Sequence, residues 1–215
     1  MKILKRIRAL ALSAVFAVTA FWGGVLSESV AKAEASTSFT DIQTHWVKET
    51  LDWAVQKNMV NGYPDGTFRP ENKVTEAEFL TMLLRLYEPN IQGETKSHWA
   101  DRYYQYGAGF NYILSGHSKN QLRDKVMNRY QVAELIAGTE GANLKGNDAV
   151  KYLLVFHLAN GKGNQVSIAG FRGNDYLTRA EALQFVRNVS TYGLGTLIVK
   201  DKKPTDPGTI PEIMQ

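Results

Sequence analysis

The sequence predicts an all-α protein of three helix–loop–helix repeats, with an export signal before them and a disordered tail after them. Three observations support this prediction: an apolar segment with a basic start opens the chain, a pattern of about fifty residues recurs three times, and each copy contains a capping signal for an α-helix. The chain has no cysteine, so disulfides are excluded and an apolar core has to stabilise the fold.

Residues 1–33 have the pattern of a secretory signal peptide. A basic start precedes an apolar stretch that ends at Leu26, and Ala31-Lys32-Ala33 has the small residues that signal peptidase requires. An uncleaved membrane anchor is the alternative, because the apolar stretch is long. The polar Ser27-Glu28-Ser29 that follows favours cleavage after Ala33, which leaves a secreted protein with no transmembrane segment.

The signal segment also accounts for the positive charge of the chain. The whole chain has 25 Lys and Arg against 21 Asp and Glu, a formal net charge of +4. Residues 1–33 contain five of the bases and one of the acids, so the mature chain has 20 of each. A neutral mature chain gives no reason to expect nucleic-acid binding.

The repeats are recognised by a tetrapeptide that recurs in each of them. Thr75-Glu76-Ala77-Glu78 and Thr178-Arg179-Ala180-Glu181 differ at one position, and Asn128-Arg129-Tyr130-Gln131 is a weaker copy. Positions 76, 129 and 179 are separated by 53 and 50 residues. The expected boundaries are 39–90 for the first repeat, 97–141 for the second and 146–192 for the third, with residues 199–215 as the disordered tail.

Each tetrapeptide predicts the start of a helix, because its first and fourth residues form a capping box. In the first repeat we expect another helix before it, which begins near Trp46 and stops at Asn61-Gly62. Tyr63-Pro64-Asp65-Gly66 between the two helices is typical of a β-turn. Gly116 and Gly161 mark the same stop in the other repeats.

Arg129 and Arg179 need a further explanation, because the helix dipole disfavours a cation at the first helical position. One interpretation is an anion site, in which the arginine lies beside free backbone N–H groups. The alternative is an arginine that contacts a neighbouring carboxylate or carbonyl group. Glu76 occupies this position in the first repeat, where it suits the dipole and would repel an anion.

These motifs are similar to those of the S-layer homology domain family of bacterial surface proteins. Phe39-Thr40-Asp41-Ile42, His45-Trp46 and the segment 61–70 resemble the first half of the family pattern, and Thr178-Arg179-Ala180-Glu181 matches its signature tetrapeptide. The resemblance covers about residues 39–190. It implies a pseudo-threefold helical bundle whose grooves, between neighbouring repeats, bind an anionic, pyruvylated secondary cell-wall polymer.

The resemblance also implies roles for individual residues. By position, the anion ligands would be Arg129 and Arg179, and the residues that shape the grooves would be Asp41, Trp46, Gly62, Trp99 and Gly116. Glu76 and the missing His-Trp pair of the third repeat depart from the family pattern, so one or two working grooves are expected. The alternative for Trp46, Trp99 and Phe68 is a place in the core.

The expected function is therefore non-covalent binding of the mature chain to the cell wall, without a cofactor or a metal. An alternative is protein–protein docking within the envelope or surface layer, with the polymer grooves decayed. A secreted hydrolase is a remote third option, because the sequence has no nucleophile elbow or phosphate loop, and its four histidines lack metal-ligand spacing. The expected location is the cell wall or surface layer.

Overall fold

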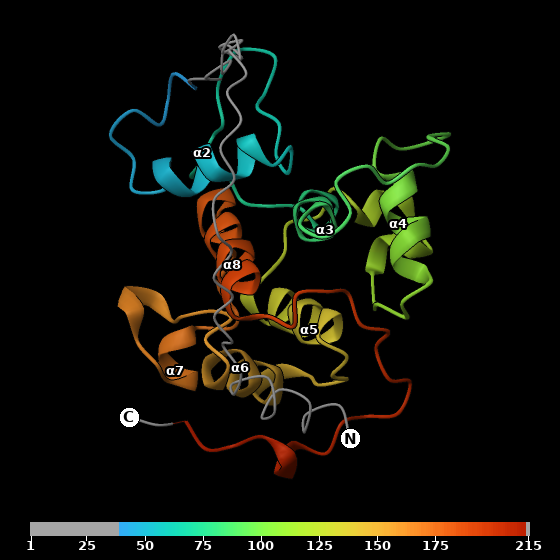
Figure 1. Cartoon of the computed structure of the whole chain (residues 1–215), viewed down its shortest axis with the longest axis vertical. Helices are drawn as coiled ribbons and strands as arrows, with labels where there is room; N and C mark the ends of the chain where they lie inside the picture. Colours follow the sequence, from blue (N-terminus) through green and yellow to red (C-terminus); the bar gives the residue numbers. More distant parts are fainter. Residues whose placement is uncertain (1–38, 214–215) are drawn as a thin grey trace, which may run out of the picture. The chain divides into compact units, whose positions relative to one another are not determined.

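Seven α-helices and four short 3₁₀ helices make up the computed structural model, which describes residues 39–213 (Figure 1). No β-strand occurs among these residues, so the prediction of an all-α protein is confirmed. The predicted signal peptide lies outside the described residues. Within the described part, no helix is both long and apolar enough to cross a membrane.

Each of the three expected repeats contains a first helix, an irregular loop and a second helix. The α-helices of the three repeats are, in order, α2 (Lys48–Gln56) and α3 (Glu76–Arg85); α4 (Asp101–Ala108) and α5 (Arg129–Thr139); α6 (Gly146–Val155), the short α7 (Ile168–Phe171) and α8 (Arg179–Tyr192). Three of the 3₁₀ helices lie in the loops of the repeats, at Ser115–His117, Asn120–Leu122 and Lys162–Asn164, and the fourth, Pro207–Thr209, lies in the tail.

The local chemistry of the tetrapeptides is confirmed in all three repeats. Complete capping boxes open α3, α5 and α8, with Thr75, Asn128 and Thr178 as the N-cap residues. The predicted β-turn is also present, because the amide of Gly66 donates to the carbonyl of Tyr63 at 3.0 Å. Helix α2 ends earlier than expected, since the left-handed backbone of Asn58 (φ 54°) stops it before Asn61.

A ring of three backbone hydrogen bonds lies where the three second helices begin. The amide of Val74 donates to the carbonyl of Leu177, that of Leu177 to Met127, and that of Met127 back to Val74, over 2.9, 3.2 and 3.0 Å. Each of these residues comes two positions before the first residue of α3, α5 or α8. The ring surrounds a pseudo-threefold axis, as the family resemblance implied.

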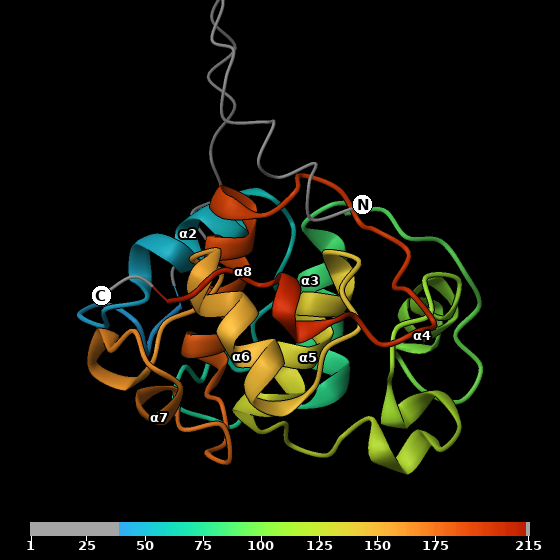
Figure 2. The same ribbon diagram turned by 90° about the horizontal axis from the view of Figure 1, so that it is seen from below.

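Helix packing follows the same threefold order around this axis. Helix α3 of the first repeat packs on α4 of the second, α5 of the second on α6 of the third, and α8 of the third on α2 of the first. Figure 2 shows two of these pairs, α2 beside α8 and α6 beside α5. The second helix of each repeat is therefore covered by the first helix of the next, and the three repeats share one apolar core.

The tail was expected to be disordered from about residue 199, and this expectation is wrong. The amides of Ile198, Lys200 and Thr205 donate to the carbonyls of Thr139, Phe110 and Asn143 at 2.9 to 3.0 Å. Ile210 is buried in the core. The tail is rich in proline and charge, but it is ordered because the body of the protein supplies the partners of its backbone.

Candidate functional site

Three grooves of the same construction surround the pseudo-threefold axis. Each is bounded by the second helix of one repeat, the loop after the first helix of that repeat, and the start of the next repeat. The preceding repeat contributes the residue at the second position of its tetrapeptide. We call them groove A, about 190 Å³, between the first and second repeats; groove B, about 330 Å³, between the third and first; and groove C, about 110 Å³, between the second and third.

Groove A holds Arg179, which is 4% exposed. Its Nε donates to the carbonyl of Phe68 at 3.0 Å, and its Nη1 pairs with the carboxylate of Glu78 at 2.6 Å. The guanidinium carbon lies 4.6 Å from the centre of the Phe68 ring, so a cation–π contact supports it. The remaining Nη2 makes no hydrogen bond within residues 39–213.

Groove B holds Arg129, which is 1% exposed and occupies the matching position. Its Nε donates to the carbonyl of Phe171 at 2.7 Å, its Nη2 to that of Asn160 at 2.7 Å, and its Nη1 to Glu181 at 3.3 Å. The two arginines thus fix the neighbouring repeat through its backbone carbonyls, as the alternative interpretation of the sequence proposed. Burial lowers the pKa of Arg129, and the charges of Glu181 and Asp175 oppose that shift.

The helix starts themselves offer no free N–H groups beside these arginines. The amides of Arg129 and Tyr130 donate to the carbonyls of Asp175 and Gly173, and the amide of Arg179 donates to that of Asn72. The part of the anion-site interpretation that relied on unpaired helix amides is therefore wrong. An anion in groove A or B would have to be held by side chains.

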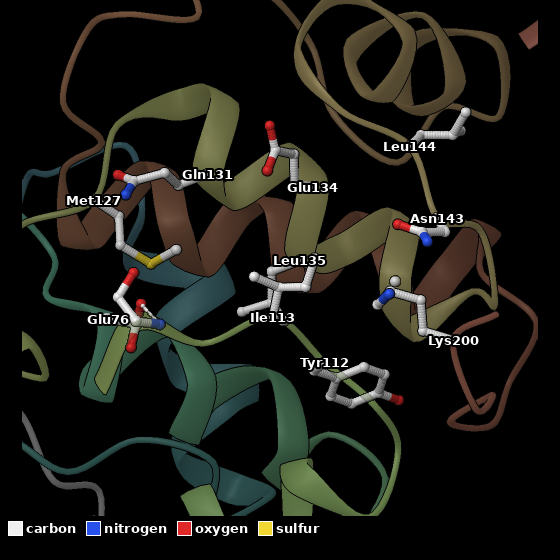
Figure 3. Close-up of a pocket in the computed structure, with 12 residues that line it drawn as sticks. Glu76, Tyr112, Ile113, Met127, Gln131, Glu134, Leu135, Asn143, Leu144 and Lys200 are labelled. Atoms are coloured by element: carbon white, nitrogen blue, oxygen red, sulfur yellow. Dashed lines mark hydrogen bonds between the residues drawn. The ribbon is translucent and has the colours of Figure 1, made fainter. Parts of the chain in front are cut away.

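In groove C the residue at the position of the arginines is an acceptor and not a donor, because it is Glu76 (Figure 3). Its carboxylate accepts hydrogen bonds from the amides of Ser115 and Gly116 at 2.9 and 2.7 Å, and from the Tyr104 hydroxyl at 2.9 Å. The carbonyl of Gly116 then accepts from Nε of Arg123 at 2.8 Å. The residue at this tetrapeptide position joins adjacent repeats in all three grooves, through carbonyls in A and B and through amides in C.

Trp46 and Trp99 lie at the mouths of the grooves and outside the core. Trp46 lines groove B and is 58% exposed, while Trp99 lines groove A and is 47% exposed. The histidine before each tryptophan accepts a backbone amide at Nδ1, 3.2 Å from Val47 in one repeat and 3.1 Å from Ala100 in the other. The core alternative is wrong for both tryptophans. For Phe68, which is fully buried, it is confirmed.

The glycines and Asp41 shape the loops that bound the grooves. A Cβ on Gly62 would lie 2.0 Å from Cε1 of Phe39, and one on Gly116 would lie 2.3 Å from Cγ of Arg123, so both positions require glycine. Asp41 accepts from the amides of Phe68 and Arg69 at 2.9 and 2.7 Å. Asp41 therefore holds the loop under Arg179 and does not line groove A.

Groove B contains a further cation, Lys162, that the sequence motifs do not indicate. Lys162 follows Gly161 as Tyr63 follows Gly62, and both residues contact the capping-box glutamate of their groove, Glu181 and Glu78 respectively. Burial alone would raise the pKa of Glu181, but the hydrogen bond from Lys162 and further favourable contacts lower it. Aligning the loops residue by residue would have identified this lysine.

The grooves differ in formal charge. Groove A has two cations, Arg85 and Arg179, against Glu78, and groove B has Arg129 and Lys162 against Glu181. Groove C has Glu76 and Glu134 against a single cation, Lys200. Grooves A and B are thus each positive by one charge and combine it with an exposed tryptophan, whereas groove C is negative by one.

A closed set of three helical repeats with such grooves has the form of a binding module, and comparison with known proteins gives the family of its first repeat. Residues 38–80 match the S-layer homology domain family. The chain therefore contains an S-layer homology domain, and the resemblance seen in the sequence is confirmed. Such a domain anchors surface proteins to the cell wall.

Several of the similar proteins are named as surface or wall proteins. The chain is 28% identical to a surface layer protein of Brevibacillus choshinensis over 80% of its own length, and 30% identical to a cellulosome-anchoring protein of Acetivibrio thermocellus over 40%. It is 28% identical to an uncharacterised cell wall amidase of Bacillus anthracis over 72%. These matches cover 15%, 22% and 32% of the three relatives, less than a third of each.

Proposed function

We propose that the mature chain binds the cell wall without catalysis and holds an anionic secondary polymer in grooves A and B. The supporting observation is that both grooves combine an excess positive charge with an exposed tryptophan at the mouth. A tryptophan face suits the apolar face of a sugar ring, and a fixed cation suits a carboxylate. The surface-layer relatives support a location in the cell wall or surface layer.

The two grooves would hold the anion through different groups. In groove A the free Nη2 of Arg179 is available, with Arg85 on the same wall. In groove B all three nitrogens of the Arg129 guanidinium are engaged, so Lys162 is the accessible cation. A pyruvylated polymer end would satisfy both grooves, since its carboxylate can pair with either an arginine or a lysine.

Groove C is not assigned to this role, because Glu76 and Glu134 give it a negative balance. The count of polymer grooves is therefore two. The expected absence of catalysis belongs to this proposal as well, since a relative named as an amidase shares the domain over only part of its length.

The proposal is tested by sedimentation of the mature chain with cell-wall sacculi. Native walls should carry the protein down, and walls stripped of secondary polymer should not. Equal sedimentation with both would contradict polymer binding and would favour docking onto other envelope proteins.

Variants at the tryptophans test the grooves with little risk to folding, because both side chains are largely exposed. Trp46→Ala and Trp99→Ala should each weaken binding about 10-fold, a loss of about 1.4 kcal/mol, and together they should abolish it. Tyr176→Ala, which removes an equally exposed ring away from the grooves, is the matched control and should bind as the wild type does.

A further inference from the structure

The peptide group between Asn61 and Gly62 is not held by hydrogen bonds. Asn61 lines groove A, and its side chain is exposed. Within residues 39–213 the side-chain amide and the carbonyl of Asn61 and the backbone amide of Gly62 make no hydrogen bond. Asparagine is a chemically labile residue, and a following glycine increases its lability. We propose that Asn61 is a site of spontaneous deamidation, which creates a carboxylate in groove A.

The reaction requires a free glycine amide next to a mobile asparagine side chain. The backbone nitrogen of Gly62 loses its proton and attacks Cγ of Asn61. A bond forms between these two atoms, the Cγ–Nδ2 bond breaks, and the side-chain nitrogen leaves with the proton as ammonia. Water then opens the cyclic imide and leaves aspartate or isoaspartate at position 61. Glycine favours the attack because no side chain shields its nitrogen.

The third repeat contains the same dipeptide, but there the peptide group is held at both ends. The amide of Gly161 donates to the carbonyl of Gln165 at 2.9 Å, and the carbonyl of Asn160 accepts from Nη2 of Arg129 at 2.7 Å. The nitrogen of Gly161 can attack only after its hydrogen bond is broken, which slows the reaction. Asn160 is exposed as Asn61 is, so the hydrogen bonds and not exposure distinguish the two sites.

Arg179 explains why the peptide group in groove A is not held. It occupies the position that Arg129 has in groove B. Its Nη1 pairs with Glu78, and its Nη2 makes no hydrogen bond within the described residues. The carbonyl of Asn61 therefore lacks the contact that fixes Asn160.

The fold retains the labile dipeptide because position 62 requires glycine. A Cβ there would lie 2.0 Å from Cε1 of Phe39. The second repeat also requires glycine at the equivalent position, Gly116, but Ser115 precedes it and its amide donates to Glu76 at 2.7 Å. Among the three repeats of the described chain, the first thus combines an asparagine with an unbonded glycine amide, and the other two do not.

The new carboxylate would change the charge of groove A, and this consequence rests on the proposed function. Groove A has one excess positive charge, from Arg85 and Arg179 against Glu78. A carboxylate at position 61 brings this balance to zero. Groove B keeps its charge, because the amide of Gly161 is bonded. Polymer binding would therefore shift toward groove B as the protein ages.

Isotope labelling tests the reaction without any ligand. The mature chain is incubated in ¹⁸O-labelled water at mildly alkaline pH and then digested in ordinary water at acidic pH, so that only conversion during the incubation carries the label. Mass spectrometry of the peptides should show Asn61 converting at least about fivefold faster than Asn160, because of the hydrogen bond on Gly161. Equal rates, or a faster reaction at Asn160, would overturn the proposal.

The same measurement in concentrated urea shows whether the fold causes the difference. In the unfolded chain neither glycine amide is held, so Asn61 and Asn160 should convert at similar rates. A difference of the same size in urea would assign the effect to the neighbouring sequence and would contradict the role of the free peptide group.

Asn61→Asp tests the effect of the new charge on groove A. In a Trp46→Ala background, which weakens groove B, the affinity for sacculi should fall about threefold. Asn174→Asp, which is exposed and outside the linings of the three grooves, is the matched control and should not change the affinity. Equal affinities of the two variants would overturn the effect on groove A. A Trp46→Ala chain that does not sediment with walls would contradict the proposed function and not the modification, which the ¹⁸O label measures by itself.

Discussion

The second residue of the tetrapeptide, which is Glu76, Arg129 or Arg179, has two roles. It joins adjacent repeats by hydrogen bonds to their backbone, and in grooves A and B it also brings a positive charge to the groove. A buried charge needs an ion pair or a full set of hydrogen bonds. Arg129 and Arg179 each pair with a glutamate, and Glu76 accepts three hydrogen bonds. Either a cation or an anion can join adjacent repeats in this way. An arginine does so by donating to backbone carbonyls, and a glutamate by accepting from backbone amides.

This dependence on the partner groups leads to a prediction for Glu76. Glu76→Arg places a guanidinium against the amides of Ser115 and Gly116, near Arg123, and leaves those amides without an acceptor. The free energy of unfolding should fall by about 3 kcal/mol. Urea denaturation measures the loss, and wall binding should not improve.

Glu94→Arg is the control for this change of charge, since Glu94 is exposed and its one ion pair within residues 39–213 is with Lys96. Its effect on stability should stay within about 0.5 kcal/mol. A Glu76→Arg protein as stable as the wild type would mean that the carboxylate is not required for the contact between the first and second repeats.

At the scale of elements, the position of α4 depends on one carboxylate. Asp101 accepts from the amides of Lys96, Ser97 and His98 at 2.8 to 3.1 Å, and it pairs with Arg123. These hydrogen bonds hold the turn that carries Trp99 into groove A. They also keep the pKa of Asp101 well below its ordinary value, chiefly through the amide of Ser97 and the Arg123 guanidinium.

The depressed pKa predicts how this element responds to acid. A carboxylate with a lowered pKa in the folded state stabilises the fold at neutral pH, and this stabilisation is lost as the pH falls below about 4. Asp101→Asn should therefore destabilise the protein at pH 7, and the difference from wild type should narrow toward pH 2. Thermal unfolding from pH 2 to 7 measures this.

Asp148→Asn serves as the matched control, because Asp148 is an exposed carboxylate in the first turn of α6. It should change stability by only a few tenths of a kcal/mol over the same range. A gap between Asp101→Asn and wild type that stays constant with pH would contradict the role of the ionised carboxylate.

The elements that the sequence revealed are those whose signals are local. A capping box lies within four residues, so the starts of α3, α5 and α8 could be predicted. The end of α2 could not be predicted, because the glycine at position 62 is the usual signal for a helix C-terminus. The helix stops before it, at the left-handed backbone of Asn58. The exposure of Trp46 depends on the third repeat, whose loop lies more than one hundred residues away in the sequence.

At the scale of the whole molecule, the ordered tail is the feature that the sequence did not reveal. Its amides donate to the backbone carbonyls of Thr139, Phe110 and Asn143. The amino-acid composition of the tail cannot predict such contacts. The pseudo-threefold arrangement was implied only by the family resemblance. The distribution of charge among the three grooves also required the structure, since each groove draws its residues from all three repeats or from the tail.

The tail should contribute measurably to stability. Ile210→Ala removes a buried side chain that belongs to the common core, and it should lower the free energy of unfolding by about 2–4 kcal/mol in a single transition. Urea denaturation followed by tryptophan fluorescence tests this. Val166→Ala, an exposed position, should have almost no effect. An equally small effect of Ile210→Ala would mean that the tail folds separately from the core.

The packing of α8 on α2 makes the three repeats a closed circle. An open array of helical repeats can gain or lose units, and it needs special units at its two ends to cover apolar surface. A circle has no end units. A fourth repeat would find no apolar face to cover, and a deletion would leave two faces bare, so this architecture fixes the number of repeats at three.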